Sequence, residues 1–294
     1  MTKTQRAFIN IRGRLMDLSV PKVMGILNVT PDSFYASSRS MVEKEIEEKA
    51  ERMISEGVDI IDVGGCSTRP GFHLPTVSEE WERVDFACRI LRGISSEIPL
   101  SIDTFRAEVA ERSISKWDVA IINDVSGGAD PDMWPMIGRK KVAYVLTHNS
   151  NGESYVEQNR ECGEEAVVIE NIKEERDITA TVITELSVKI DKLHQLGVND
   201  VIIDPGFGFS KTIKENFQLL RELNEIVRMN LPVMVGISRK SMIYKTLGGT
   251  PEESLAGTVV LDTVALLKGA SILRVHDIAE AVSTIKLVET LNRR

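Results

Sequence analysis

The sequence is poor in cysteine and lacks the features that would place it in a membrane or on a nucleic acid. Its three cysteines, Cys66, Cys88 and Cys162, show no CxxC or CxxxC spacing, which argues against a disulfide framework and a zinc site. No apolar run approaches the roughly 18 residues of a membrane span. The net charge is −8 and no basic stripe is present, which argues against nucleic-acid binding. We therefore expect a cytoplasmic protein with reduced thiols and no membrane or nucleic-acid partner.

What the sequence does contain is a repeated pattern of strands and helices. Eight short apolar runs alternate with amphipathic segments, as in a parallel sheet. The runs cover residues 23–28, 59–65, 100–104, 119–125, 142–148, 201–209, 233–238 and 271–276. This order predicts an α/β fold in which one domain, residues 1–294, forms a closed (β/α)₈ TIM barrel. An open doubly wound sheet is the alternative, but no GxGxxG turn follows the first strand.

Two segments lie outside this repeat. Residues 8–18, FINIRGRLMDL, predict a short hairpin within residues 1–20 that turns at Arg12-Gly13 and caps the amino-terminal end of the barrel. The longest connection, residues 149–177, is polar and acidic, and it predicts a loop that carries a short helix or moves as a lid.

Polar side chains collect where the predicted strands end. The carboxyl ends of all strands in such a barrel converge on one mouth, where chemistry is done. Asp103, Asn123 and Asp204 each end an apolar strand, where a carboxylate is costly to desolvate unless it is paired. The other residues expected at the mouth are Asn28, Ser67, Thr68, Arg69, Asp124, His148, Asn149, Ser238, Arg239, Lys240, Ser241, Arg274, His276 and Asp277. One of these alone fits a helix cap or a salt bridge, but polar residues on all eight strands indicate a binding site.

The kinds of side chain at the mouth indicate the ligand. The two carboxylates and the carboxamide that end strands suit a flat heterocycle with adjacent N–H and amino donors. Arg274, His276 and Asn28 suit an anion, because the first and last strands are neighbours in a closed barrel. Lys240 could serve either part. We therefore predict an amino-substituted heterocycle that carries a phosphate group.

Seven segments between residues 24 and 277 carry a combined signature. They are MGILNVTPDSF, GVDIIDVGGCSTRPG, SIDTFRAEVA, INDVSGG, IIDPGFGFSK, VGISRKS and ILRVHD. Together they resemble the dihydropteroate synthases, a family of pterin-binding (β/α)₈ enzymes of folate biosynthesis. The resemblance implies a transferase that joins 6-hydroxymethyl-7,8-dihydropterin pyrophosphate to p-aminobenzoate. The products would be 7,8-dihydropteroate and pyrophosphate, and Mg²⁺ would assist.

The resemblance also implies roles for single residues. It implies pterin binding by Asp103, Asn123, Asp204, Lys240 and Arg274, which would stack over the ring. It implies pyrophosphate binding by Asn28, Arg274 and His276, with Asn28 near the metal. It implies p-aminobenzoate binding by Thr68, Arg69, Pro70, Phe209 and Ser241. Catalysis would fall to Asp103, Lys240, Arg274 and His276. The p-aminobenzoate pocket would be a sulfonamide target, since a sulfonamide mimics that aryl amine.

The chain departs from the family pattern at two positions. Ala36 stands where the family usually has an aspartate after Ser-Phe, so a loop carboxylate is absent. Thr147 stands where methionine commonly precedes His148, so a hydroxyl replaces an apolar contact beneath the pterin. We expect the reaction to pass through a pterin cation formed as pyrophosphate leaves, and Asp103 to carry more of its stabilisation because Ala36 supplies none.

Other functions remain open at this point. A methyltetrahydrofolate:corrinoid methyltransferase also binds a pterin with Asp and Asn residues, but it needs no pyrophosphate clamp and no SRKS lysine. A Schiff-base aldolase using Lys240 is disfavoured by Arg239 beside it. A non-catalytic pterin-binding paralogue is suggested only by the missing loop carboxylate.

The last predicted helix bears on assembly. The family is typically dimeric through its last helices, so the resemblance implies a homodimer. Residues 278–290 carry an apolar stripe of Ile278, Val282, Ile285 and Val288, which we expect to be core, with an interface as the alternative.

Overall fold

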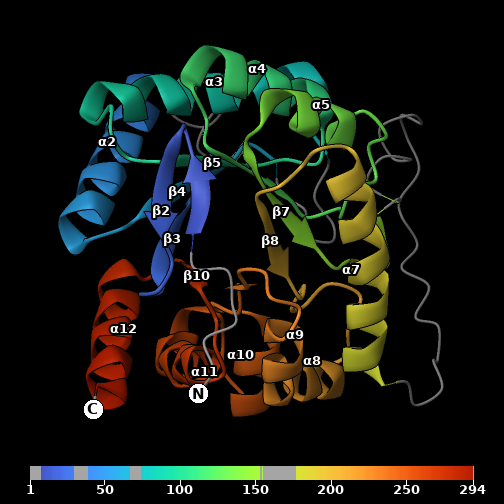
Figure 1. The fold of residues 1–294 in the computed structure, drawn as a ribbon. Helices are drawn as coiled ribbons and strands as arrows, with labels where there is room; N and C mark the ends of the chain where they lie inside the picture. Colours follow the sequence, from blue (N-terminus) through green and yellow to red (C-terminus); the bar gives the residue numbers. More distant parts are fainter. Residues whose placement is uncertain (1–7, 30–38, 67–73, 153, 155–176, 294) are drawn as a thin grey trace.

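The computed structural model describes residues 8–29, 39–66, 74–152, 154 and 177–293 (Figure 1). Helices surround a central set of strands in this part of the chain. None of the described helices is both long enough and apolar enough to cross a membrane.

The first described element is the predicted hairpin. Strands β1 (Phe8–Ile11) and β2 (Arg14–Asp17) pair antiparallel. Arg12 and Gly13 form the two-residue turn with φ values of +52° and +76°, the conformation that tight hairpins favour. Ile9 and Ile11 are buried against apolar side chains from the amino-terminal half of the barrel strands. The hairpin therefore closes that end of the barrel, as predicted.

The eight predicted strands form one parallel sheet. They are β3 (Lys22–Asn28), β4 (Ile60–Gly64), β5 (Leu100–Asp103), β6 (Ile121–Asp124), β7 (Ala143–Thr147), β8 (Val201–Asp204), β9 (Met234–Val235) and β10 (Ile272–Val275). Their order is β8-β7-β6-β5-β4-β3-β10-β9. A parallel bridge between Ile203 and Val233 connects the two ends of this row and closes the ring. The closed barrel is confirmed, and the open doubly wound alternative is wrong.

The helices cover the outside of this ring (Figure 1). They are α2 (Arg39–Glu56), α3 (Val77–Ile94), α4 (Ala107–Trp117), α5 (Met133–Lys140), α7 (Ile178–Gln195), α8 (Ile213–Arg221), α9 (Leu223–Val227), α10 (Ser241–Leu247), α11 (Leu255–Leu267) and α12 (Ile278–Asn292), with a 3₁₀ turn η1 (Glu252–Ser254). On α12, Ile278, Ile285 and Val288 are buried and Val282 packs against them. The stripe on α12 is therefore core.

Alternation along the strands separates two interiors. On β4, Ile61 and Val63 pack in the large apolar cluster shared with the helices, whereas Ile60 packs in the smaller cluster inside the barrel. Since successive side chains point to opposite faces of a strand, Asp62 and Gly64 share the inner face with Ile60. The floor of the barrel is thus apolar, and the layers above it, toward the carboxyl ends of the strands, are polar.

Candidate active site

An ion cluster of three side chains lies at the centre of the mouth. Arg274, on β10, donates from Nε to Oδ2 of Asp62 at 2.7 Å and from Nη2 to Oδ2 of Asp103 at 2.6 Å. The Asp62 side chain is fully buried, and those of Asp103 and Arg274 are each 17% exposed. Buried charges persist only when they are paired and hydrogen-bonded. The guanidinium therefore holds two carboxylates from two other strands in place.

The cluster changes the proton affinity of its members. Burial raises the pKa of Asp103 to about 7, Arg274 opposes that shift and Asp62 adds to it. Burial by itself would lower the pKa of Arg274, but Asp62 and Asp103 outweigh it and raise that pKa. Arg274 is therefore a permanent cation, whereas Asp103 can change its charge near neutral pH.

Asn123 extends the cluster to β6. It lies opposite Asp103 in the strand register, and its Nδ2 donates to Oδ2 of Asp62 at 3.0 Å. Its own Oδ1 is buried and has no hydrogen-bond partner in the described part of the chain. The same holds for Oδ1 of Asp62, Oγ of Ser101 and Oγ1 of Thr147. Buried polar atoms are nearly always satisfied in native proteins, so four such atoms on neighbouring strands indicate a place for a polar ligand or for water.

Lys240 and Asp204 form the opposite side of the mouth. Nζ of Lys240 donates to the carbonyl of Phe207 and lies 4.7 Å from the centroid of the Phe209 ring. Burial lowers the pKa of Lys240 to about 8, although Asp204 acts to raise it. A Cβ on Gly208 would lie 3.2 Å from the lysine side chain, and φ there is +83°, so a glycine is needed for this loop to approach Lys240.

His276 and Asn28 flank the cluster on the neighbouring strands. Nδ1 of His276 lies 3.0 Å from Oγ of Ser238. Burial, together with the nearby cations Arg274, Lys49 and Arg239, lowers the pKa of His276 to about 4. His276 is therefore a neutral hydrogen-bonding group at pH 7. Oδ1 of Asn28 lies 3.0 Å from the point that a Cβ on Gly64 would occupy, so this glycine leaves room for the asparagine beside Asp103.

Several residues expected at the mouth have other partners. Asp124 points away from the barrel interior and accepts hydrogen bonds from Ser126 and from the Tyr144 hydroxyl at 2.7 Å. Arg239 and Asp277 form a two-bond ion pair with each other, at 3.0 and 2.6 Å. These three side chains therefore have bonding partners within the protein, and their contact with a ligand stays a prediction.

Of the remaining expected site residues, some lie in the described part of the chain and others do not. His148 is buried and lies 3.0 Å from Nζ of Lys211 and 3.1 Å from the Glu185 carboxylate, so it belongs to a network beside the mouth. Ser241 begins α10 directly after Lys240. Other predicted positions lie outside the described residues, namely Ser67, Thr68, Arg69, Pro70, Ala36 and most of the 149–177 connection.

Asp62 was missed by the sequence analysis. A signal for it exists: it is a carboxylate in the middle of the apolar run DIIDVGG, two residues before Gly64 and two after Ile60. Strand periodicity would have placed it on the inner face of the barrel.

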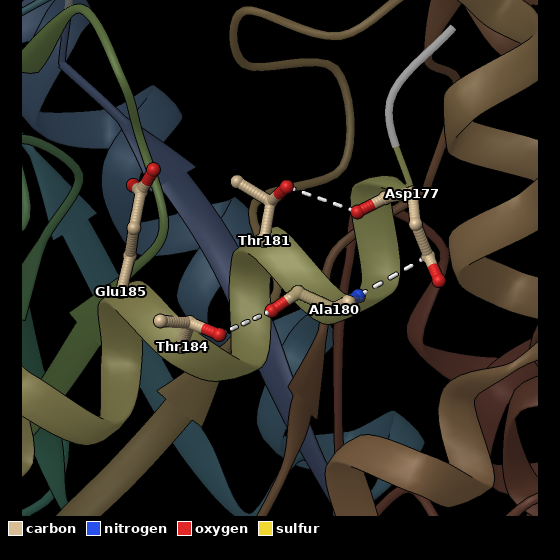
Figure 2. A pocket seen from close by; sticks show the side chains of 5 residues that line it. All are labelled: Asp177, Ala180, Thr181, Thr184 and Glu185. Carbon is tan, nitrogen blue, oxygen red and sulfur yellow. Dashed lines mark hydrogen bonds between the residues drawn. The ribbon is translucent and has the colours of Figure 1, made fainter.

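A surface hollow of about 400 Å³ lies elsewhere, along α7 (Figure 2). It is lined by Asp177, Ala180, Thr181, Thr184 and Glu185. The hydroxyls of Thr181 and Thr184 donate to carbonyls of their own helix, those of Asp177 and Ala180, at 2.9 and 2.8 Å (Figure 2). This hollow contains none of the predicted site residues, so the ion cluster at the barrel mouth remains the candidate active site.

The fold and this site define a class: a (β/α)₈ barrel enzyme with carboxylate, carboxamide and cationic groups around one mouth. Residues 24–276 match the family of pterin binding enzymes. The chain is 36% identical over 282 residues, 95% of this chain and 94% of the relative, to a dihydropteroate synthase of Escherichia coli strain K12.

Two solved structures are similar throughout. The dihydropteroate synthase of Xanthomonas albilineans with 4-aminobenzoic acid is 31% identical with a TM-score of 0.84, covering 98% of this chain and 99% of the other. That of Yersinia pestis with a sulfonamide drug is 32% identical with a TM-score of 0.82, covering 97% and 98%. The chain belongs to the pterin binding enzyme family, among the dihydropteroate synthases, and is a transferase. This favours the synthase over the methyltransferase, the aldolase and the non-catalytic paralogue.

Proposed function

We propose that this enzyme joins 6-hydroxymethyl-7,8-dihydropterin pyrophosphate to p-aminobenzoate and releases 7,8-dihydropteroate and pyrophosphate, as its relatives' name implies. The observation that carries the proposal is the buried set of acceptors around Arg274. Asp103, Asn123 and Asp204 come from three strands of one barrel mouth, and Oδ1 of Asn123 lacks a protein partner among the described residues. A pterin ring presents the N–H and amino donors that such acceptors require.

The pterin would lie between the acceptors and Lys240. Asp204 already accepts from the backbone N–H of Gly206 at 2.8 Å through Oδ1, and its other oxygen would accept from a ring donor. Lys240 would donate to a ring oxygen or nitrogen, since its ammonium is close to Asp204 and Phe209. Arg274, tied to two carboxylates, would offer the face of its guanidinium for stacking on the ring.

The pyrophosphate would lie at the junction of β10 and β3. Arg274 supplies the positive charge, and neutral His276 supplies a ring N–H, since its lowered pKa of about 4 leaves it uncharged at pH 7. Asn28 completes this side, because β3 and β10 are adjacent.

Asn28 also fits a role as a magnesium ligand. Its exposed side chain carries an amide oxygen, which is a suitable donor for Mg²⁺. The described residues contain no group of three or more His, Cys, Asp or Glu that could hold a metal by themselves, and Mg²⁺ commonly takes one or two protein ligands and completes its shell with phosphates and water. We therefore propose that Mg²⁺ binds together with the pyrophosphate. The ion would neutralise charge on the leaving group.

The p-aminobenzoate would approach the methylene carbon from the side of Phe209 and Ser241. Thr68, Arg69 and Pro70 belong to the same proposed pocket by resemblance, and they lie outside the described residues. A sulfonamide would occupy this pocket because it matches p-aminobenzoate in size and polarity. The ionised form of Asp103 would stabilise positive charge on the pterin as pyrophosphate departs.

We further propose that the enzyme is a cytoplasmic homodimer. The buried free thiol of Cys88 is in keeping with a reducing compartment. Large apolar side chains are exposed on three neighbouring helices, namely Leu247 on α10, Val260 and Leu267 on α11, and Leu287 and Leu291 on α12. A second copy of this chain would cover them.

The decisive experiment for the activity is direct. The purified protein is mixed with both substrates and Mg²⁺, and dihydropteroate and pyrophosphate are measured together. Formation of both in equal amounts supports the proposal. Stoichiometric pterin binding without either product would identify a binding protein instead.

A further inference from the structure

Asp62 lies at the base of the ion cluster, and the proposed function gives it no role of its own. It lies on β4 with a fully buried side chain. A single oxygen, Oδ2, accepts both from Nε of Arg274 at 2.7 Å and from Nδ2 of Asn123 at 3.0 Å. Asp62 therefore connects two groups that the proposed function assigns to the pterin.

The contact with Asp62 determines which end of the Asn123 amide meets the ligand. A carboxylate paired with a guanidinium can only accept hydrogen bonds. The atom of Asn123 that faces it must then be the NH₂ group. The carbonyl Oδ1 is left as the buried atom without a protein partner in the described chain. Asn123 thus presents its carbonyl oxygen, an acceptor, to whatever occupies the mouth.

The same carboxylate fixes the plane of Arg274. Nε and Nη2 lie along one edge of a guanidinium, and Asp62 and Asp103 occupy that edge from two different strands. With one edge held, the guanidinium cannot rotate about its long axis. Its flat face and Nη1 are kept in one orientation relative to the ligand.

We propose that Asp62 is a positioning residue that sets the hydrogen-bond polarity of Asn123 and the plane of Arg274, so that the mouth accepts the donor edge of a pterin. This inference rests on the proposed function. The competing explanation is that Asp62 only balances the charge of Arg274 and stabilises the barrel, as buried ion pairs do elsewhere. The two explanations differ in what two substitutions do.

Asp62→Asn and Asp62→Leu form a matched pair. An asparagine oxygen can accept from both Arg274 and Asn123, so Asp62→Asn keeps the polarity but removes the charge. Leucine is similar in size and accepts nothing. Asp59→Asn is the control, because Asp59 is a carboxylate that directly precedes β4, at the end remote from the mouth, and pairs with Lys22 at 3.3 Å.

The measured quantity is the dissociation constant of 6-hydroxymethyl-7,8-dihydropterin pyrophosphate, obtained by calorimetry, with thermal unfolding recorded in parallel. We expect Asp62→Leu to weaken binding by roughly 10- to 100-fold, as for loss of hydrogen bonds to charged groups. Asp62→Asn should recover most of that loss, and Asp59→Asn should bind as the wild type does. Equal losses in both Asp62 variants would show that charge balance alone matters and would overturn the proposal.

A double-mutant cycle tests whether the effect passes through Asn123. In an Asn123→Ala background, Asp62→Leu should cost several-fold less affinity than in the wild type, because part of its target is gone. Full additivity would overturn the proposal. The wild type separates the role of Asp62 from the proposed function. If the wild type binds the pterin pyrophosphate and forms dihydropteroate, full additivity in the cycle rejects only the role of Asp62. If the wild type neither binds nor reacts, the proposed function and the role of Asp62 are both rejected.

Discussion

Arg274 balances the charge of two carboxylates at the mouth, those of Asp62 and Asp103. Its removal by Arg274→Ala would leave the carboxylates of Asp62 and Asp103 buried and facing each other, at a cost of roughly 3–5 kcal/mol in stability. We expect turnover to fall by about 10²-fold or more, as for loss of one preorganised charged donor. Binding of the pyrophosphorylated pterin should weaken more than binding of 6-hydroxymethyl-dihydropterin. Calorimetry with both ligands checks this.

Lys240→Ala is the comparison for that measurement. It should also lower turnover by about 10²-fold. Because Lys240 lies beside Asp204 and Phe209, away from β3, its loss should weaken both pterin ligands alike. Equal weakening of the two ligands by Arg274→Ala would place Arg274 away from the pyrophosphate.

Asp103 gives the enzyme a predicted pH dependence. Burial raises its pKa to about 7, so the carboxylate that stabilises the cation is mostly protonated at pH 6. The pH dependence of kcat/KM reports the ionisation of groups in the free enzyme. We therefore expect kcat/KM to rise as pH increases through about 7. Asp103→Asn should bind the pterin nearly normally, lower the chemical step by roughly 10²-fold, and lose this rise. A rise that persists in Asp103→Asn would assign it to another group.

The same raised pKa affects stability in the opposite direction, because the stability of the fold falls as pH rises. The folded-state pKa of Asp103 lies above its unfolded value of 3.8. The folded state therefore binds the proton more tightly, and its advantage is lost as pH rises from about 4 to about 7. We expect the melting temperature of the wild type to fall relative to that of Asp103→Asn as pH increases across this range. Thermal unfolding of both proteins checks this.

At the scale of elements, the strands could be predicted well because their side chains alternate or form short apolar runs. All eight predicted runs contain a strand, and the hairpin turns where Arg12-Gly13 indicated. β9 has only two residues, since Gly236 follows at once and the chain turns toward Lys240. Pattern alone cannot give that length, because sheet pairing depends on the neighbouring strand.

The site was predicted less completely than the strands, for a reason visible at Asn123 and Asp124. Adjacent residues on a strand point to opposite faces, so only one of them can reach the mouth, and the structure has Asn123 there. The pairing of Arg239 with Asp277 joins segments 38 residues apart. Such partners depend on tertiary packing, which the sequence pattern does not contain. Asp62, by contrast, was predictable from periodicity.

The loop after β8 is held by hydrogen bonds from one lysine, Lys211. Nζ of Lys211 donates to the carbonyls of Gly206, Phe209 and His148, at 2.9, 3.2 and 3.1 Å. Lys211→Met keeps the aliphatic stem but leaves these carbonyls unsatisfied, which should destabilise the protein by roughly 1–3 kcal/mol. The loop carries Phe209, so we expect KM for p-aminobenzoate to rise more than that for the pterin substrate. Steady-state kinetics with each substrate varied checks this.

Lys214→Met provides the control for that experiment. Lys214 lies on α8, the helix that follows the loop. Its substitution should leave both KM values near those of the wild type. If Lys211→Met lowers stability but shifts neither KM, the lysine supports the fold without placing Phe209.

At the scale of the whole molecule, the exposed leucines on α12 predict assembly. Leu287 and Leu291 are each 72% exposed and one turn apart on the helix, so they form one apolar strip. We expect the wild type to have twice the 32.7 kDa mass of the chain by light scattering. Leu287→Glu with Leu291→Glu should shift the protein toward monomer, because charges would then face each other across the interface. The exposed Val188→Glu on α7 serves as the control. A monomeric wild type would contradict the dimer.

The closed barrel also bears on the order of bond making and breaking. Its floor is an apolar cluster and its mouth holds Asp103 beside Arg274, an arrangement that can stabilise positive charge on the ring while holding the departing anion. The aryl amine of p-aminobenzoate is a weak nucleophile, so it should capture a cation more readily than it displaces pyrophosphate. We therefore expect ionisation to come first. A pterin pyrophosphate labelled with ¹⁸O at the bridging position tests this: incubation with enzyme and Mg²⁺, without p-aminobenzoate, should scramble the label into non-bridging positions. Asp103→Asn should slow the scrambling by about the same factor as turnover. Absence of scrambling, together with near-normal turnover in Asp103→Asn, would contradict both the cation and the role of Asp103.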